Sequence, residues 1–390
     1  MPQQRLKIAV LIKRFIATGG AERYAVEVAR RLADRGHRID LYAREAEEGL
    51  VAGIRFVKIP DRLRFSSVLN SWSFARQTAR RLAGGAYDVI FSHERGFSQD
   101  LAAIHTFSYR LGLENISFLK KINSLYLSPR SWLHLRLERQ QMESAWLVPV
   151  SNTIKDGIAR YYRRTENVAV ATPGVDVDFF NPAWIRDHRN SARDNQGLTP
   201  DELAVLFVGS EFKRKGLDDL IRAIRPGMHL IVVGGGERTG YYRRLVASCG
   251  ATDRVAFRGL TDDVRRCYAA ADVVVLPSLR AFGMSILEGM ACGLPVISSA
   301  AAGVSGLLDH GVNGYVFNRP GELAGLLENL KSPDLRQALG VQARRTAKAH
   351  TWEKTADVFE KVCREIAGQK QPGRHNRHSV VSAPDVTCGF

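Results

Sequence analysis

The sequence predicts an α/β protein made of two doubly wound parallel-sheet domains. Three observations lead to this fold class. Apolar strand segments alternate with helical segments, the alternation restarts after residue 200, and 390 residues are too many for one compact core. Ligands bind such sheets at the carboxyl ends of the strands. We therefore expect the two domains to face each other across a cleft that holds the site.

The first half of the chain alternates strand and helix signals from its start. Apolar runs bounded by turn residues predict strands, and apolar residues at helical spacing predict helices. The expected strands are KIAVLI (7–12), HRIDLYA (37–43), IRFVKI (54–59) and YDVIFSH (87–93), and the expected helices are 21–34 and 72–82. Because helices intervene between the strands, we expect the strands to pair in parallel.

The second half repeats this organisation. The expected strands are LAVLFVGS (203–210), HLIVVGGG (229–236), RVAFRG (254–259), DVVVLPS (272–278) and PVISS (295–299), and the expected helices are 217–224, 241–248, 262–270 and 285–290. The intervening segment ATPGVDVDFFNPAWIRDHRN (171–190) is rich in Pro, Gly and Asp, which predicts a hinge.

These patterns predict four parts of the chain. Residues 1–184 and 185–349 form two Rossmann-like domains, and residues 350–367 form a helix that packs back on the first domain. Residues 368–390 are polar and lack periodicity, which is typical of a disordered tail.

The composition is that of a soluble enzyme, with 45% hydrophobic and 25% charged residues. No apolar run approaches the roughly 20 residues of a membrane-spanning helix, and the N-terminus lacks a signal-peptide cleavage pattern. Five cysteines without a Cys-x-x-Cys spacing argue against a disulfide framework and against a thiolate zinc site. We therefore expect a cytoplasmic protein.

The formal net charge of +16 calls for an anionic partner or a broadly solvated basic surface. Nucleic acid, an anionic membrane and a phosphorylated substrate are the candidate partners. The sequence has no helix-turn-helix, zinc-finger or aromatic-sheet motif, so we expect no nucleic acid among the partners.

Two segments have the chemistry of anion binding. Gly19 and Gly20 stand where a strand leads into a helix, so backbone amides can approach an anion at the positive end of the helix dipole; a plain turn is the alternative. In VGSEFKRKGLDDLI (208–221) a basic run follows a strand. Cations there can neutralise a diphosphate leaving group.

The segment PSLRAFGMSILEGMACG (277–293) joins a strand to a helix that carries one carboxylate, Glu288. A carboxylate there can accept hydrogen bonds from a ribose diol, or it can merely complement the helix dipole. The loop at 281–285 offers backbone amides to a phosphate.

Three further motifs carry weaker signals. The glycines of VVGGGERTG (232–240) are spaced too widely for a dinucleotide loop and are expected to be structural. Asp176 and Asp178 have a metal-chelating spacing, but no strand leads to them, so we expect no metal. His93 and His105 follow the strand YDVIF; each is a candidate polar contact or proton shuttle, or an ordinary satisfied histidine.

Several ordered segments together resemble the retaining glycosyltransferases of family 4, which have the two-domain GT-B fold. They are GGAER (19–23), PGVD (173–176), VGSEFKRKGLDDLI, VAFRGLTDDVRRCYAAADVVVLPS (255–278), FGMSILEGMACGLPVISS (282–299) and HGVNGYVF (310–317). The resemblance covers about residues 6–367. The residues of VGSEFKRKG and SHERGFSQD are most similar to those of the family branch that acts on the bacterial lipopolysaccharide core.

The resemblance implies a role for each matching residue. Arg214 and Lys215 would bind the donor diphosphate and stabilise the leaving nucleotide, and Glu288 would hold the ribose hydroxyls. His105 matches a position that approaches the donor sugar and is needed for activity. The remaining donor-binding residues would be Gly19 and Gly20 at the diphosphate, Arg258 and Leu260 at the base, and Phe282, Gly283, Met284 and Ser285 over the sugar and phosphate.

The resemblance also implies the chemistry. The family uses a nucleotide-sugar donor, requires neither cofactor nor metal, and retains the anomeric configuration without a protein nucleophile. The acceptor would be a glycolipid or oligosaccharide bound by the first domain, at the cytoplasmic face of the anionic inner membrane.

One position departs from the family pattern. Where the family has Glu-x7-Glu, with the first Glu on the donor-sugar hydroxyls, this chain has Arg280. Either the donor sugar carries an acid, such as a uronic acid, which an arginine fork suits, or the loop is rearranged and Arg280 contacts phosphate or solvent. A catalytically inactive relative and a nucleotide-sugar epimerase on the same fold are further alternatives.

The first domain has two segments in which basic residues interleave with aromatic residues. In DRLRFSSVLNSWSFARQTARRL (61–82) the aromatic residues are Phe65, Trp72 and Phe74, and SFLKKINSLYLSPRSWLHLRLER (117–139) repeats the pattern. Such segments fit docking on an anionic membrane or binding of a phosphorylated glycolipid. Ordinary helices with a core face are the alternative.

Overall fold

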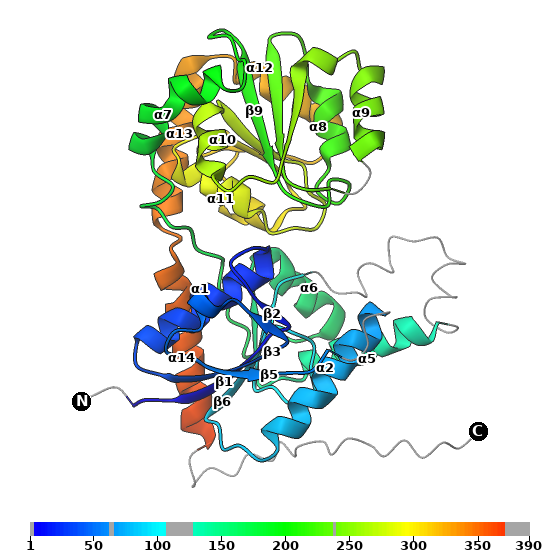
Figure 1. Cartoon of the computed structure of the whole chain (residues 1–390), viewed down its shortest axis with the longest axis vertical. Coiled ribbons are helices and arrows are strands. Elements are labelled where there is room, and N and C mark those ends of the chain that lie inside the picture. The colour runs from blue at the N-terminus through cyan, green and yellow to red at the C-terminus, as the bar shows by residue number, and fades with distance from the viewer. Residues whose placement is uncertain (1–3, 62–65, 107–127, 237–238, 371–390) are drawn as a thin grey trace. The chain divides into compact units, whose positions relative to one another are not determined.

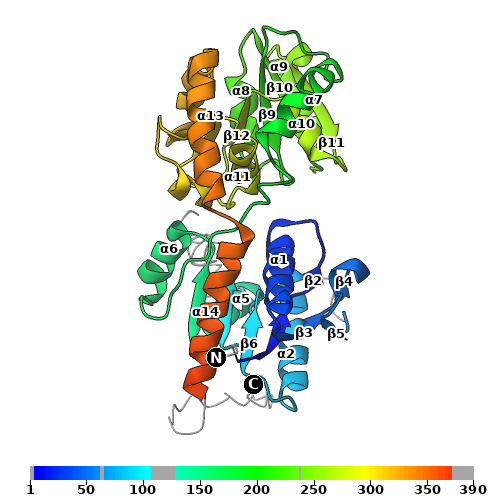
Figure 2. The ribbon, with the colours of Figure 1, turned by 90° about the vertical axis from the view of Figure 1, so that its left-hand side faces the viewer.

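The computed structural model describes residues 4–61, 66–106, 128–236 and 239–370 (Figures 1 and 2). The chain divides into two compact units. Unit 1 comprises residues within 1–150, 154–171 and 355–390, and unit 2 comprises residues 151–153 and 172–354. Residues 172–184 thus group with unit 2, and the C-terminal helix from residue 355 groups with unit 1.

Each unit has its own set of strands and helices. The elements up to residue 162, together with the last helix, are β1 (Lys7–Leu11), β2 (Arg14–Phe15), α1 (Gly20–Asp34), β3 (Arg38–Ala43), β4 (Glu45–Ala46), η1 (Glu48–Leu50), β5 (Arg55–Lys58), α2 (Ser67–Leu82), β6 (Val89–Ser92), β7 (Leu101–Ile104), α5 (Pro129–Met142), β8 (Trp146–Pro149), α6 (Asn152–Tyr162) and α14 (Trp352–Lys370). Those of unit 2 are α7 (Pro182–Asp194), β9 (Leu203–Val208), α8 (Leu217–Ala223), β10 (Met228–Val233), α9 (Thr239–Ser248), η3 (Thr252–Arg254), β11 (Val255–Gly259), α10 (Val264–Ala270), β12 (Val273–Leu276), α11 (Met284–Ala291), β13 (Val296–Ser299), η4 (Gly303–Leu307), β14 (Tyr315–Phe317), η5 (Pro320–Glu322), α12 (Leu323–Asn329) and α13 (Pro333–Lys348).

Both units contain a six-stranded parallel sheet of the same topology. The order is β5-β3-β1-β6-β7-β8 in unit 1 and β11-β10-β9-β12-β13-β14 in unit 2. In each sheet the chain adds strands outward from the first strand on one side and then returns to add strands on its other side, so the switch point lies between β1 and β6 or between β9 and β12. Open α/β sheets bind ligands beside such a reversal, at the carboxyl ends of the strands. The predicted α/β fold with two Rossmann-like doubly wound sheets is confirmed.

The unit 1 sheet is covered on both faces. Ala9 and Leu11 of β1 pack in a cluster with Phe74 of α2. On the other face α1 and α14 lie side by side (Figures 1 and 2), and the rings of Tyr24 and Phe359 are 5.8 Å apart. The predicted interfacial role of Phe74 is therefore wrong, because its side chain is fully buried in the core.

The helix α14 packs on unit 1 through a stripe of buried apolar residues and through hydrogen bonds to the carboxylate of Glu360. Its buried residues in unit 1 recur every three or four positions, which gives one apolar face: Ala356, Phe359, Cys363 and Ile366. Glu360 accepts hydrogen bonds from Arg35 Nη1 at 2.8 Å and from Arg364 of its own helix, and it lies 3.3 Å from His37 Nε2. Burial opposes ionisation of this carboxyl group, but these bonds outweigh it and lower the pKa of Glu360 to about 2.

Two further sequence predictions need correction. The expected hinge at 171–190 contains the start of a helix, α7. Asn181 caps this helix by accepting a hydrogen bond from the amide of Trp184. Pro182 occupies the first turn, where a backbone N–H has no partner within the helix, so the missing N–H of proline costs no hydrogen bond. The expected tail at 368–390 begins inside α14, which extends to Lys370; residues 371–390 lie outside the described part of the chain.

Candidate functional site

In unit 2, the loop that follows β9 carries the basic run. Lys215 folds back so that its side chain lies against Gly209 at the end of the strand: a Cβ on Gly209, whose φ is 156°, would stand 2.0 Å from Lys215 Nζ. A side chain on Gly209 would therefore displace the ammonium group from the end of β9.

The ammonium group of Lys215 is poorly solvated. Burial lowers its pKa, the adjacent Arg214 lowers it further, and the carboxylates of Glu211 and Glu288 partly offset both effects. A cation that has lost water and stands beside a second cation favours an anionic ligand. Lys213 in the same loop is exposed and its side chain makes no hydrogen bond or ion pair with the described residues.

The second predicted diphosphate residue, Arg214, is paired within its own loop. Its Nε donates to Glu211 Oε2 at 2.9 Å, and Nη2 bonds to the same oxygen. Glu211 has a φ of 56°, in the left-handed region that non-glycine residues rarely adopt. Such strain often accompanies ligand loops. Sequence reasoning missed Glu211, although an acid three residues before an arginine was a visible signal.

The ribose candidate Glu288 is held on α11. It is buried, and its Oε2 accepts a hydrogen bond from the hydroxyl of Tyr268 on α10 at 2.7 Å. The same hydroxyl lies 3.2 Å from the carbonyl oxygen of Ser285. Tyr268 thus fixes one carboxylate oxygen and the first turn of α11. No sequence pattern indicated Tyr268, because its position depends on packing between two helices.

The loop that follows β12 carries Arg280 and leads to α11. The amides of Arg280 and Ala281 donate to Ser278 Oγ at 3.3 and 3.0 Å, which stabilises the turn. The exposed side chain of Arg280 forms neither an ion pair nor a hydrogen bond with any residue that the structure describes. Gly283, with a φ of 104°, is the N-cap of α11.

Of the other predicted donor-binding residues of unit 2, Phe282, Met284, Ser285 and Leu260 lie at the same edge, whereas the side chain of Arg258 turns toward the segment that leads into β9, at the amino edge of the sheet. Phe282 is half-buried against the core, Met284 begins α11, and the side chain of Ser285 is buried. Leu260, which follows β11, is 81% exposed, and Arg258 Nη2 lies 3.4 Å from the carbonyl oxygen of Gln196.

The glycines after β10 have packing roles. A Cβ on Gly236 would meet the ring of Phe212 at 2.4 Å, and one on Gly234 would meet the carbonyl oxygen of Gly209 at 2.3 Å. The prediction of structural glycines is confirmed for these two positions; Gly240 has no comparable contact with the described residues.

Unit 1 holds the remaining predicted residues. Gly19, with a φ of 96°, is the N-cap of α1, and Gly20 begins the helix. No atom of the described residues lies within 4 Å of a Cβ placed on Gly20, so packing against them does not require glycine there. His93 and His105 follow the neighbouring strands β6 and β7, and His93 Nδ1 lies 2.9 Å from His105 Nε2. Burial lowers the pKa of His93, and the charge of His105 lowers it further; burial lowers the pKa of His105 to about 4.

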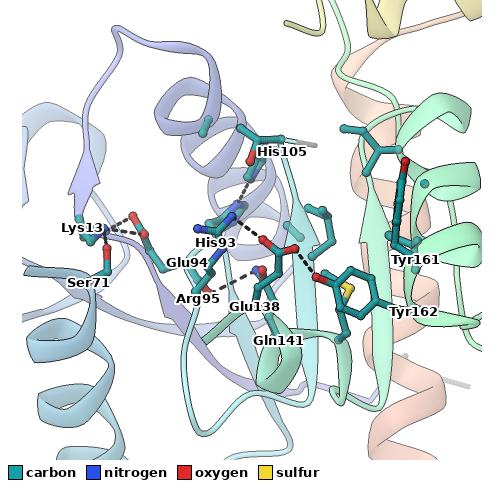
Figure 3. Close-up of a pocket in the computed structure, with 18 residues that line it drawn as sticks. Lys13, Ser71, His93, Glu94, Arg95, His105, Glu138, Gln141, Tyr161 and Tyr162 are labelled. Carbon is teal, nitrogen blue, oxygen red and sulfur yellow. Dashed lines mark hydrogen bonds and ion pairs between the residues drawn. The ribbon is translucent and has the colours of Figure 1, made fainter. Parts of the chain in front are cut away.

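The two histidines line a cavity of about 260 Å³ at the carboxyl ends of β1, β6 and β7 (Figure 3). The cations of this cavity are already paired. Lys13 Nζ lies 3.0 Å from Glu94, and Arg95 Nη2 donates to Glu138 at 3.0 Å. The other polar lining residues labelled in Figure 3 are Ser71, Gln141, Tyr161 and Tyr162. Sequence reasoning missed all the polar lining residues except the histidines.

Asp176 and Asp178 do not act together. Asp176 Oδ1 accepts hydrogen bonds from the amides of Asp178 and Phe179 at 3.1 and 2.9 Å, which makes a local turn. Among the described residues, no three His, Cys, Asp or Glu side chains gather in a metal-binding arrangement. No helix within the described ranges is long and apolar enough to cross a membrane.

Comparisons with known proteins add to this geometry. The family model Glycosyltransferase Family 4 matches residues 18–179, and the model Glycosyl transferases group 1 matches residues 188–346. A D-inositol 3-phosphate glycosyltransferase of Thermobispora bispora is 29% identical over 387 residues, which cover 88% of this chain and 89% of that protein.

Two solved structures are similar in fold. WaaG, a glycosyltransferase involved in lipopolysaccharide biosynthesis, superposes with a TM-score of 0.79 at 22% identity and covers 93% of this chain and 100% of its own. HepE of Anabaena in complex with UDP-glucose gives a TM-score of 0.71 at 18% identity, with coverage of 93% and 100%. Thus the likeness to the lipopolysaccharide branch is one of fold, whereas the sequence relative bears a different name.

The two family matches follow each other along the chain, and the fold is that of GT-B enzymes. The chain is therefore a glycosyltransferase of the GT-B fold, with a Glycosyltransferase Family 4 domain followed by a Glycosyl transferases group 1 domain.

Proposed function

We propose that this enzyme transfers a hexose from a UDP-sugar to a hydroxyl group of a membrane-associated glycolipid, with retention of configuration and without a metal ion. The observation that carries the donor assignment is the desolvated ammonium of Lys215 at the carboxyl end of β9, close enough to Glu288 for the carboxylate to affect its pKa. The UDP-glucose complex of HepE, a protein of the same fold, supports the choice of donor.

The chemistry requires a stabilised leaving group. The bond between the sugar C1 and the β-phosphate oxygen breaks, a bond between C1 and the acceptor oxygen forms, and the acceptor proton passes to the leaving phosphate. Lys215 and Arg214 neutralise the charge that develops on the diphosphate. Arg214 would exchange its bond with Glu211 for phosphate oxygens. Amides at the start of α11 supply further donors, and Glu288 accepts from the ribose.

The donor proposal is tested by supplying UDP-glucose and following both products by NMR. We expect UDP to be released and the transferred or hydrolysed sugar to appear first as the α-anomer. A β-anomer as the first product contradicts retention, and failure of UDP to bind contradicts the donor assignment.

We propose that the unit 1 cavity receives an uncharged, hydroxyl-rich ring of the acceptor. Its two cations are each paired with a carboxylate, so a phosphate would have to displace Glu94 or Glu138. Hydroxyl groups, in contrast, can donate to these carboxylates and accept from the remaining polar groups. We expect inorganic phosphate to leave the binding of a free monosaccharide unchanged; competition between the two contradicts this assignment.

The same proposal places the enzyme at the cytoplasmic face of an anionic membrane. Arg136 lies over the 57%-exposed Trp132 of α5 at 5.3 Å, and Arg76 lies over Trp72 of α2 at the same distance. Such pairs join a cation to an interfacial aromatic ring. Phe65 and residues 117–127 of the predicted surface lie outside the described part of the chain. We expect salt-sensitive binding to anionic vesicles, and equal binding to neutral vesicles at high salt contradicts this placement.

The guanidinium of Arg280, which has no partner among the described residues, favours a second donor class, a nucleotide-linked uronic acid. Arginine binds carboxylates through two parallel hydrogen bonds. A donor screen decides between the classes: turnover of UDP-glucose without turnover of UDP-glucuronate or UDP-galacturonate rules out the acidic donor. Turnover of a uronate that is lost in Arg280→Leu supports it.

A further inference from the structure

The two histidines of unit 1 form a hydrogen-bonded pair at the edge of the cavity. Because β6 and β7 are adjacent and parallel, residues that follow them lie side by side, as Figure 3 shows. The rings are inclined by only 16° to each other, and His93 Nδ1 lies 2.9 Å from His105 Nε2. One nitrogen of this pair must donate and the other must accept.

The ring of His93 has an apolar enclosure. The exposed fraction of His93 is 7%. Its ring centroid lies 4.4 Å from that of Phe91 and 6.1 Å from that of Tyr24. The hydroxyl of Tyr24 donates to the carbonyl oxygen of Ala171 at 2.8 Å. The other ring nitrogen of His93, Nε2, is buried and has no hydrogen-bond partner within the described part of the chain.

This orphaned nitrogen indicates which histidine donates. Both rings are neutral, because burial disfavours the charged form, and a neutral imidazole carries one N–H. If Nδ1 of His93 accepted, the proton would sit on Nε2 as a buried N–H without an acceptor. If Nδ1 donates, Nε2 is only a bare acceptor. Orphaned buried N–H groups are rarer than unsatisfied acceptors, so the second arrangement is favoured.

We propose that His93 is a positioning residue that donates from Nδ1 to Nε2 of His105, fixes His105 as the Nδ1–H tautomer, and makes it present an N–H donor to the cavity. His105 lines the cavity, and its Nδ1 makes no hydrogen bond with the described residues. The inference rests on the proposed function in one respect, that a sugar or acceptor oxygen receives the bond. His105 then acts as a donor and not as a base, since the leaving phosphate takes the acceptor proton.

The tautomer is read directly by NMR of the full-length protein labelled with ¹⁵N in its histidine rings. The signals of the pair are assigned with His105→Gln and His93→Asn. We expect His105 to be a single neutral tautomer with the proton on Nδ1. A proton on Nε2, or a mixture of the two tautomers, overturns the proposal.

Three variants separate the hydrogen bond from packing. His93→Phe keeps an aromatic ring but removes the donor, so His105 should become a mixture of tautomers. His93→Asn places an amide N–H where Nδ1 was and should restore the Nδ1–H form. Phe91→Leu loosens the same enclosure without touching the hydrogen bond, so it should lower stability and leave the tautomer unchanged. An unchanged His105 tautomer in His93→Phe contradicts the positioning role.

Kinetics with UDP-glucose separate this inference from the proposed function. We expect His93→Phe to lower kcat roughly tenfold, the effect of losing one well-oriented hydrogen bond, with KM for UDP-glucose unchanged and with His93→Asn close to wild type. Unchanged kcat in His93→Phe contradicts the positioning role. If the wild-type protein releases no UDP from UDP-glucose, the proposed function fails, while the tautomer measured in the free protein still supports or overturns the pairing.

Discussion

Replacing Lys215 with Met tests the donor site at its most specific point. Methionine keeps the length and apolar stem of the side chain but removes the desolvated ammonium that lies against Gly209. A hydrogen bond to a charged group contributes about 1.5–3 kcal/mol, which corresponds to a loss of roughly 10- to 150-fold in affinity. We expect the Kd for UDP, measured by isothermal titration calorimetry, to rise within this range. Thermal stability should be unchanged or higher, because removing a half-buried cation relieves its desolvation.

The matched control is Lys213→Met in the same loop. Lys213 is exposed and its side chain has no partner in the described ranges, so its variant should change the Kd for UDP less than about threefold after screening by solvent. Wild-type affinity in Lys215→Met, or an equal loss in Lys213→Met, refutes the assignment of Lys215 as the specific diphosphate contact. An equal loss would instead indicate a diffuse effect of net charge.

Three further predictions follow from the same contacts. Gly209→Ala should displace the ammonium of Lys215 and weaken UDP binding about tenfold, whereas Gly250→Ala, at a φ of 61° with open space around it, should cost about 1 kcal/mol of stability and leave UDP binding unchanged. Glu288→Gln should reduce the preference for UDP over 2′-deoxy-UDP, measured as a ratio of Kd values; an unchanged ratio argues against the ribose contact. The pKa of Glu360 falls from 4.5 to about 2 on folding, so its contribution to stability is complete above pH 4.5 and is lost as the pH falls toward 2. Glu360→Gln should therefore lower the free energy of unfolding by about 1–3 kcal/mol at pH 7 but by much less at pH 2, as denaturant titrations can show.

The sequence predicted the parts of the fold that depend on local pattern. Each sheet begins with an apolar run, such as 7–12 or 203–210, and the turns that follow these runs hold the glycines and cations of the site. Because parallel strands end at one edge, residues such as Lys215 and Glu288 could be assigned to a common site without knowledge of their contacts.

The features that the sequence did not predict depend on contacts between distant segments. Tyr268 meets Glu288 only because α10 packs beside α11, and Arg95 meets Glu138 only because α5 packs against the segment that follows β6. The strands β7 and β8 were also missed, since LAAI and WLVP are too short to show the alternation of apolar and polar residues that identifies a strand. The helix α7 was missed because its capping residues, Asn and Pro, are also the residues of a hinge.

The central claim is that unit 2 binds a nucleotide-diphosphate sugar at the carboxyl ends of β9 and β12. A crystal structure of the protein with UDP-glucose tests it most directly. We predict the diphosphate within hydrogen-bond distance of Lys215 Nζ and of the α11 amides, the ribose hydroxyls on Glu288, and Arg214 turned from Glu211 toward phosphate. A nucleotide bound elsewhere, or bound here with Lys215 and Glu288 both out of contact, would contradict the account.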